Sequence, residues 1–218
     1  QAAKWQDANR TWWEGHPMRY DWKAPVGKDE FSKEFFEEID RRFLATSREF
    51  LPFKSVPFDA LIDFAGLKDK DVLEIGVGNG SHASLLARHA RSFTGIDLTD
   101  YAVRSTTARF AHFGLRGNIL RMDAEQMSFP DASFDFVWSW GVIHHSSNTR
   151  RILEHWASLP LPPCALAIQG TATTARTART ESARFVMRWG DAAPMPFPPL
   201  KRRLATPISH RADRATKP

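Results

Sequence analysis

One short segment, Asp71 to Gly80, constrains this chain more than any other. It reads Asp-Val-Leu-Glu-Ile-Gly-Val-Gly-Asn-Gly, in which the acid Glu74 interrupts an apolar run that ends in three alternating glycines. Glycine has no Cβ, so such a loop lets the backbone approach a ligand closely. A lone acid, Asp97, ends the next apolar run about twenty residues later, where a strand-end carboxylate can bind a ribose. The pattern predicts a nucleoside-containing ligand across the ends of a parallel sheet.

The length and cysteine usage narrow the class of protein. A chain of 218 residues is long enough for one α/β domain with a full core. The single cysteine, Cys164, excludes a disulfide framework and a cysteine-based zinc site. No apolar run approaches the roughly 20 residues that span a bilayer, and no signal-type segment opens the chain, so we expect a cytoplasmic protein. The first residue is Gln rather than Met, which indicates a processed or incomplete N-terminus.

The net charge of +5 is concentrated near the C-terminus. Residues 160–218 carry ten Lys and Arg against three acids, so the rest of the chain is slightly acidic. A basic balance confined to one segment is weak support for nucleic-acid binding by the folded body. We therefore expect no specific nucleic-acid partner.

The first 66 residues combine aromatic and helical patterns. Residues 1–27 are rich in Trp, and we interpret them as an irregular but packed arm. Apolar residues then recur at helical spacing over 32–51, with charges on the other face, which predicts an amphipathic helix. A second short helix is expected over 58–65, closed by Gly66. We assign residues 1–66 to an arm with lid helices.

From residue 70 onward, strand and helix patterns alternate with short connections. Such alternation predicts right-handed crossovers and a parallel sheet. These elements form a core domain over residues 67–159. The expected strands are 72–75, 92–96, 118–122 and 134–140, and the expected helices are 81–89, 100–113 and 148–156.

The pattern changes abruptly at residue 160. Residues 164–169 could form a fifth strand, but no periodicity follows, and we expect no later strand. Residues 160–218 are rich in Pro, Ala, Arg and Thr, a composition typical of a weakly folded tail. Because this bias starts at a motif boundary, we interpret the segment as a basic tail that is disordered or arises from a frameshift.

The spacing of the glycines narrows the class of ligand. Gly76, Gly78 and Gly80 are spaced G-x-G-x-G, whereas a dinucleotide-binding loop reads G-x-G-x-x-G and places a pyrophosphate at a helix N-terminus. The tighter spacing suits a cofactor without phosphate. Glu74 would repel a pyrophosphate but is compatible with a cationic cofactor. The alternative is a tight strand-to-helix turn that binds no ligand.

Two further acids follow strand ends. Asp97 can accept from both hydroxyls of a ribose; the alternative is an N-cap for the next helix, which Thr99 or Asp100 would provide as well. Asp123 can accept from an adenine amino group while the next backbone N–H donates to a ring nitrogen; the alternative is a loop acid or a helix cap. Parallel strands end at one edge of a sheet, so we expect these acids to lie together.

Adjacent histidines, His144 and His145, follow the fourth strand. Neighbouring side chains point apart and no third ligand is suitably spaced, so we predict no metal site. Either imidazole, with an unperturbed pKa near 6.5, could act as a general base. The alternative is that a histidine hydrogen-bonds a cofactor carboxylate or caps a loop.

Four segments, in this order, resemble a known family. They are similar to motifs of the class I S-adenosylmethionine-dependent methyltransferases, most of all to the small-molecule, methyltransferase type 11-like branch that includes quinone-biosynthesis enzymes. The likeness covers residues 60–157. The segments are Val72 to Gly80, Gly95-Ile96-Asp97, Asp123-Ala124-Glu125 and the stretch from Phe134-Asp135 to His144-His145.

This resemblance implies a Rossmann-like, doubly wound α/β fold with a mostly parallel sheet and an N-terminal helical and aromatic lid. The Pro-Gly-Gly turn that the family usually has after the fourth-strand helix is absent, so the C-terminal strands are expected to be missing. The implied cofactor is S-adenosylmethionine. The implied contacts are Glu74, Gly76, Gly78 and Gly80 along its methionine and ribose, Asp97 at the ribose, Asp123 and Ala124 at the adenine, and Gly141 at the methionine end, with Leu98 as a further cofactor-binding residue.

Together these inferences predict methyl transfer from S-adenosylmethionine to a small-molecule acceptor of the quinol, lipid or aromatic type, by in-line SN2 displacement. His144 or His145 would remove a proton from an oxygen or nitrogen acceptor. Trp12, Trp13 and Tyr20 could line the acceptor pocket, although core packing explains a single aromatic residue equally well. The alternatives are a nicotinamide-dependent oxidoreductase and a catalytically inactive, truncated cofactor-binding module.

Overall fold

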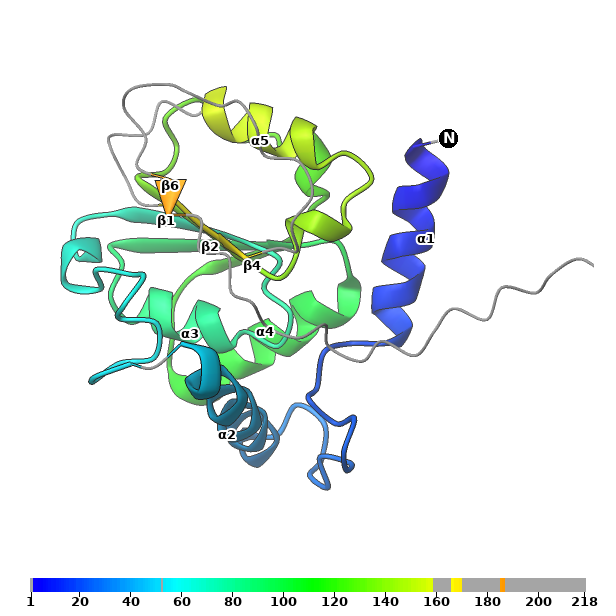
Figure 1. Cartoon of the computed structure of the whole chain (residues 1–218), viewed down its shortest axis with the longest axis vertical. Helices are drawn as coiled ribbons and strands as arrows, with labels where there is room; N and C mark the ends of the chain where they lie inside the picture. The colour runs from blue at the N-terminus through cyan, green and yellow to red at the C-terminus, as the bar shows by residue number, and fades with distance from the viewer. Residues whose placement is uncertain (1, 52, 159–165, 170–184, 187–218) are drawn as a thin grey trace, which may run out of the picture.

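The computed structural model describes residues 2–51, 53–158, 166–169 and 185–186. They form a parallel six-stranded sheet in the order β3-β2-β1-β4-β5-β6, with helices on both faces (Figure 1). This is the doubly wound α/β arrangement that the sequence predicts. The strands are β1 (Asp71–Ile75), β2 (Ser92–Asp97), β3 (Asn118–Arg121), β4 (Phe136–Trp140), β5 (Leu166–Gln169) and β6 (Phe185–Val186).

The strand order reverses beside β1, at the centre of the sheet. The chain runs outward from β1 through β2 to β3 and returns to β4 on the other side of β1. Ile75 at the end of β1 lies opposite Ile96 of β2, and its other neighbour is Ser139 of β4. All strands end at the same edge, the carboxyl edge. At such a reversal, the loops diverge and leave a crevice where α/β proteins bind ligands.

Helices cover the sheet in two layers. α3 (Ser81–Ala87) and α4 (Asp100–Phe113) lie on one face, and α5 (Thr149–Ser158) lies on the other (Figure 1). Successive β1 side chains alternate between the layers, since Val72 belongs to the apolar cluster on the α3 side and Leu73 to the cluster that contains Ile152 of α5. Burial on both faces explains why β1 and β4 consist largely of apolar residues, whereas the edge strand β3 is mostly exposed.

α2 (Lys33–Phe50) packs on the outer side of α3 and α4 (Figure 1). Ser32 caps its N-terminus by accepting a hydrogen bond from the N–H of Phe35. The fully buried Arg109 of α4 donates to Asp40 of α2 at 2.8 Å. The amphipathic helix predicted over 32–51 is confirmed. Its buried face consists of Phe35, Phe36, Ile39 and Phe43.

The N-terminal arm is helical where we predicted irregular structure. α1 (Ala2–Gly15) was missed because it has no apolar stripe. Within residues 4–15 only positions 6, 9, 10, 13 and 14 are half-buried, and most of these are polar. The expectation of a packed arm is also wrong for Trp5 and Trp12, whose exposed fractions are 68% and 54%.

The helix predicted over 58–65 is wrong. Phe58 is buried with a φ of +69°, and the segment folds as turns followed by the 3-10 helix η1 (Ala65–Leu67). The carboxylate of Asp59 accepts hydrogen bonds from the backbone N–H groups of residues 54–56, which favours the turn over a helix. Gly66 therefore lies inside η1 and does not close a helix.

Only parts of the C-terminal segment belong to the described residues. β5 confirms the strand expected within 164–169, and it pairs in parallel with β6. The expectation of no later strand is therefore wrong, because a strand of two residues is too short to leave a periodic pattern. The interpretation of the tail as disordered or frameshifted concerns residues outside the described ones. In the described part of the chain, no helix has both the length and the apolarity to cross a bilayer.

Candidate active site

The loop between β1 and α3 adopts backbone angles that favour glycine. Gly76, Gly78 and Gly80 have φ angles of +83°, +52° and +78°, in the region that L side chains disfavour. A Cβ on Gly76 would lie 2.3 Å from Cγ2 of Val142, in the loop after β4. A Cβ on Gly80 would lie 2.9 Å from Oγ1 of Thr106, on α4. Packing alone therefore requires glycine at these two positions.

Gly78 and Gly141 differ, because a side chain there would enter open space. Their φ angles are +52° and +69°, and an added Cβ would meet no atom of the described residues within 4 Å. Both lie at the carboxyl edge, one after β1 and the other after β4. Bare backbone that faces open space fits a ligand lying against the main chain, as the sequence predicts.

Asp97 ends β2 beside the glycine loop. Its Oδ2 accepts from the N–H of Gly78 at 3.1 Å, and its Oδ1 accepts from the N–H and the Oγ1 of Thr99 at 3.0 and 2.8 Å. A carboxylate has about four acceptor positions, so Oδ2 keeps capacity to accept from a ribose hydroxyl. Thr99 is the N-cap of α4, so the capping alternative for Asp97 is wrong.

The electrostatic surroundings of Glu74 and Asp97 favour a cation nearby. Burial raises the pKa of Asp97, while hydrogen bonds from Thr99 and Gly78 oppose the increase. Glu74 is 2% exposed, and its Oε2 has no hydrogen-bond partner among the described residues. Burial and the nearby Asp97 carboxylate raise its pKa well above the ordinary value, while Arg109 opposes this. A cationic ligand would lower both pKa values, which agrees with the ligand charge inferred from the sequence.

Asp123 follows β3 and caps the 3-10 helix η2 (Ala124–Gln126). Its Oδ1 accepts from the N–H of Glu125 at 2.8 Å and from Nε2 of Gln6, on α1, at 2.9 Å. The cap that we kept as an alternative is thus present. Oδ2 accepts no hydrogen bond from another described residue, so it can still accept from a ligand amino group. Ala124 opens η2, and the half-buried Leu98 follows Asp97.

Glu125 joins the loop after β3 to the loop after β4. The residue is 8% exposed, and its carboxylate accepts from Oγ of Ser146 and of Ser147 and from the N–H of Asn148. These bonds hold the segment that directly follows the histidine pair. Sequence reasoning noted Glu125 only as part of a motif, because a loop-to-loop contact leaves no periodic signal.

His144 and His145 lie in the 3-10 helix η3 (Ile143–His145), with ring centroids 3.9 Å apart. Burial lowers the pKa of both, and the neighbouring His144 lowers that of His145 further, to about 4. Both pKa values therefore lie below the unperturbed value of 6.5, and the neutral imidazole is the main form of each residue at pH 7. The ring of Trp13, on α1, packs edge-on against His145 at 5.0 Å between centroids. A neutral imidazole beside an aromatic wall can accept a proton.

Asn79 holds the glycine loop in place, and sequence reasoning missed it. Its Nδ2 donates to the carbonyl of Met18, its Oδ1 accepts from Oγ of Ser105, and its carbonyl accepts from Nε of Arg109. These three bonds join the loop to the N-terminal segment and to α4. The only sequence signal for a role of Asn79 was its position between Gly78 and Gly80.

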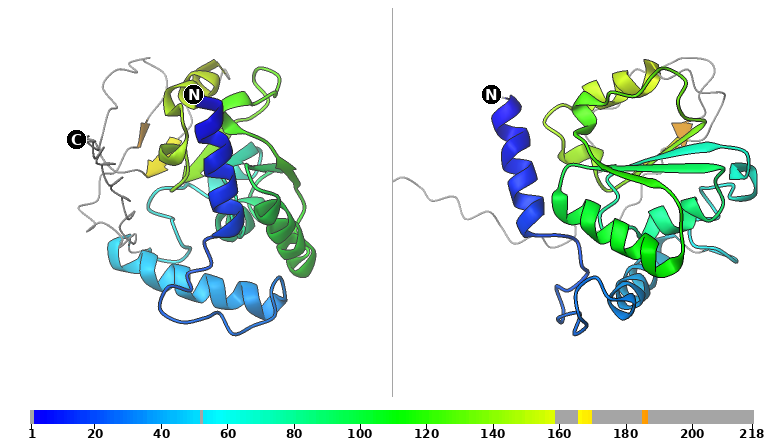
Figure 2. Two further views of the ribbon diagram at one scale, coloured as in Figure 1. Left: turned by 90° about the vertical axis from the view of Figure 1, so that its right-hand side faces the viewer. Right: turned by 180° about the vertical axis from the view of Figure 1, so that it is seen from behind.

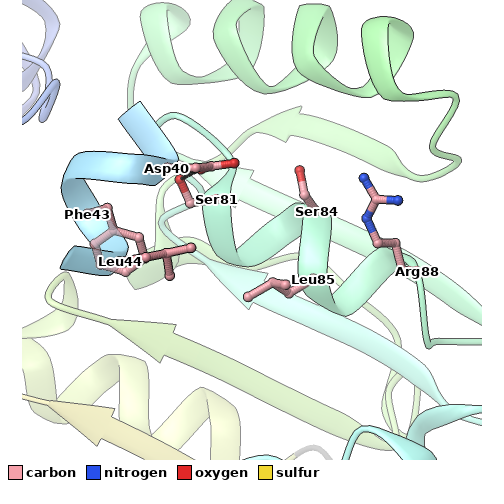
Figure 3. A pocket seen from close by; sticks show the side chains of 7 residues that line it. All are labelled: Asp40, Phe43, Leu44, Ser81, Ser84, Leu85 and Arg88. Carbon is pink, nitrogen blue, oxygen red and sulfur yellow. Dashed lines mark hydrogen bonds between the residues drawn. The ribbon is translucent and has the colours of Figure 1, made fainter. Parts of the chain in front are cut away.

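A separate cavity lies between α2 and α3 (Figure 3). It has a volume of about 150 Å³, and its lining includes Asp40 of α2 and Ser84 of α3. None of the site residues predicted from the sequence lines it. The candidate site is therefore the carboxyl edge and not this cavity.

The chain is similar to known methyltransferases. The family model described as a methyltransferase domain matches residues 72–161. An uncharacterized methyltransferase of Mycobacterium tuberculosis, Rv0089, is 30% identical over 156 residues, which cover 66% of this chain and 78% of that protein. A phthiotriol/phenolphthiotriol dimycocerosates methyltransferase of the same species is 37% identical over 94 residues, which cover 42% of this chain and 33% of that protein.

Among solved structures, a SAM-dependent methyltransferase from Aquifex aeolicus is 25% identical, with a TM-score of 0.49. The match covers 59% of this chain and 69% of that one. The family match favours methyl transfer over the nicotinamide-dependent alternative. The chain belongs to the class I S-adenosylmethionine-dependent methyltransferases, and S-adenosylmethionine is its cofactor.

Proposed function

We propose that this chain transfers the methyl group of S-adenosylmethionine to a small apolar acceptor of the quinol, lipid or aromatic type. One observation carries the proposal. Carboxylates, bare glycine backbone and neutral imidazoles all belong to the carboxyl edge, where Gln6 of α1 contacts Asp123 and Trp13 of α1 contacts His145. The carboxylates and the glycine backbone suit an adenosyl cation, and the imidazoles suit an acceptor that must lose a proton.

The residues at this edge fit the cofactor. Main chain at Gly78 would lie along its ribose and methionine, with Oδ2 of Asp97 accepting from a ribose hydroxyl. Oδ2 of Asp123 would accept from the adenine amino group, and Gly141 would leave room for the methionine end. The buried Glu74 carries an Oε2 atom with no partner among the described residues, and it would offset the positive charge.

The cofactor supplies an activated methyl group, so the chain has to position the acceptor and exclude water. Holding two reactants in line can lower a barrier by about 7–11 kcal/mol. His145 is neutral at pH 7 and would accept the proton of an oxygen or nitrogen nucleophile. The ring of Trp13 would hold the acceptor close to His145.

Two observations support an apolar acceptor. Trp13 supplies an aromatic surface beside His145. One relative is named for a lipid, although the chain spans a third of that relative's length.

The test is transfer of a labelled methyl group, screened against quinol, lipid and small aromatic acceptors. The wild type should label at least one class. Asp97→Ala should weaken binding of S-adenosylhomocysteine at least about tenfold, because it removes a charged hydrogen-bond acceptor. Asp131→Ala is the matched control, since Asp131 is an exposed loop acid.

Two results would contradict the proposal. Equal affinity of Asp97→Ala and wild type for S-adenosylhomocysteine would remove the ribose assignment. Tight binding of this ligand without labelling of any acceptor would favour the inactive-module alternative.

A further inference from the structure

The N-terminal segment contacts the segments that follow β1, β2, β3 and β4. Side chains or carbonyls from residues 6–18 hydrogen-bond at each of these places, across long stretches of sequence. The contacts, from β1 to β4, are Met18 carbonyl with Asn79 at 2.7 Å, Glu14 with the N–H groups of Asp100 and Tyr101 at 2.8 and 3.0 Å, Gln6 with Asp123 at 2.9 Å, and Asn9 with the carbonyl of His145 at 3.0 Å.

The face of α1 that lies against the carboxyl edge makes these contacts. Gln6, Asn9 and Trp13 are half-buried and recur at helical spacing, so they point toward the carboxyl edge together. Trp5 and Trp12 lie beside this face of the helix and are exposed. Seen from the side of the strand ends, α1 runs across the molecule (Figure 2, left).

α1 docks mainly by polar contacts. In the described part of the chain, none of the three apolar core clusters includes a residue of α1. A hydrogen bond contributes only about 0.5–1.5 kcal/mol net. Elements with few buried apolar contacts open most easily. A ligand beneath the helix would supply contact surface that the protein itself does not.

Gln6 contacts both the proposed adenine side of the site and the side that carries the histidine pair. Its Nε2 donates to Oδ1 of Asp123, and its Oε1 lies 3.5 Å from the N–H of Ser147, a long hydrogen bond. Asp123 is the proposed adenine ligand, and Ser147 belongs to the loop that carries the histidine pair. The remaining oxygen of Asp123, Oδ2, can accept from an adenine amino group without displacing Gln6.

We propose that Gln6 is a positioning residue that couples adenine binding to closure of α1 over the acceptor side of the site. An adenine amino group on Oδ2 fixes the Asp123 carboxylate, and the fixed carboxylate holds Gln6. α1 then places Asn9 on the His145 carbonyl and Trp13 against its ring. The inference rests on the proposed function, because Asp123 must be the adenine ligand.

Because the coupling is reciprocal, it can be measured as the effect of adenine on α1 or as the effect of α1 on adenine binding. If adenine stabilises the closed position of α1, weakening that position must weaken adenosine binding, by at most the same factor. Loss of the Gln6 bond should therefore lower the affinity for adenosine-containing ligands. The expected decrease is about two- to twelvefold, which corresponds to one hydrogen bond.

The first test is amide hydrogen exchange of the wild-type chain with S-adenosylhomocysteine, adenosine or L-methionine. We expect slower exchange over α1, residues 2–15, with the two adenine-containing ligands and no change with L-methionine. Equal protection by L-methionine, or unchanged α1 exchange at saturating S-adenosylhomocysteine, would overturn the coupling. This measurement needs no variant and no acceptor.

The second test compares Gln6→Leu with Lys4→Met, which changes an exposed side chain on the same helix. Gln6→Leu should bind S-adenosylhomocysteine more weakly by the stated factor and lose the ligand-dependent protection of α1. Lys4→Met should match wild type in both. If Gln6→Leu keeps the wild-type affinity for S-adenosylhomocysteine and the wild-type protection of α1, the coupling through Gln6 is overturned, but the proposed function is not. Failure of the wild type to bind S-adenosylhomocysteine would overturn the proposed function as well.

Discussion

The backbone N–H of Gly78 donates a hydrogen bond to Oδ2 of Asp97 at 3.1 Å, which ties the loop after β1 to the acid that ends β2. The two residues come from neighbouring parallel strands, so the contact depends on the sheet order and not on sequence proximity. In this position Gly78 has a φ of +52°, and a Cβ added to it would meet no atom of the described residues within 4 Å.

Gly78→Ala should separate ligand contact from backbone strain. Alanine at a positive φ costs about 1–2 kcal/mol, and the new methyl group would occupy space assigned to the cofactor. Gly114→Ala is a matched control: Gly114 has a φ of +61°, also has open space around its Cβ position, and ends α4. Urea unfolding should show similar losses for both variants. Calorimetry should show weaker S-adenosylhomocysteine binding for Gly78→Ala only; equal affinities would contradict the site.

Glu74→Gln should change how stability depends on pH. The folded pKa of Glu74 is raised, so above its unfolded pKa, near 4.5, the unfolded chain ionises first. Wild-type stability should then decline by up to about 1.4 kcal/mol per pH unit until the folded pKa is reached. The glutamine side chain of the variant cannot ionise, so the variant should gain stability relative to wild type as the pH rises from 4.5.

Urea unfolding between pH 4.5 and 8 measures this difference for Glu74→Gln. Glu49→Gln, at an exposed position of α2, serves as the control. A difference in stability between wild type and Glu74→Gln that is constant across this range would show that Glu74 does not carry the proton.

His82 should make stability rise with pH, opposite to the effect of Glu74 and at lower pH. Burial lowers its pKa to about 3, and its Nδ1 accepts from Nε1 of Trp138 at 3.1 Å. Below pH 6.5 the unfolded chain takes up a proton that the folded chain does not, so stability falls as the pH decreases toward 3. His82→Gln should remove up to about 1.4 kcal/mol per pH unit of this dependence. Thermal unfolding from pH 7 to 4 is the measurement, and exposed His16→Gln should behave like wild type.

His145→Gln should slow transfer to oxygen and nitrogen acceptors by about 10²–10⁴-fold, the usual contribution of a general base. The pKa of His145 is lowered to about 4, so its base form is fully populated at neutral pH and is lost only as the pH falls through 4. The wild-type rate constant should therefore not change through ionisation of His145 between pH 6 and 8. Single-turnover kinetics across this range measure it, with His144→Gln as the comparison. Equal rates for wild type and His145→Gln would exclude the base.

The core of the fold followed from the sequence because β1 and β4 are largely apolar and helices such as α2 have an apolar stripe. The sequence predicted α4 with its observed bounds, since Thr99 caps its start and Gly114 ends it with a left-handed backbone. α2 was equally clear from its four buried aromatic and aliphatic residues. Local patterns of this kind need no knowledge of the rest of the chain.

The parts that were missed depend on contacts between distant segments. α1 is held by Gln6 and Asn9 through bonds to residues more than 100 positions away, and such polar contacts leave no hydrophobic periodicity. The turn at Phe58 depends on Asp59 accepting several backbone N–H groups. The lowered pKa of His145 likewise comes from burial, which a motif cannot reveal.

A crystal structure with S-adenosylhomocysteine tests the central claim most directly. We predict the adenosine across the ends of β1 and β2, with a ribose hydroxyl within hydrogen-bond distance of Oδ2 of Asp97 and the adenine amino group at Oδ2 of Asp123. Ligand density elsewhere, with the space beside Gly78 filled by side chains of the protein, would contradict the account.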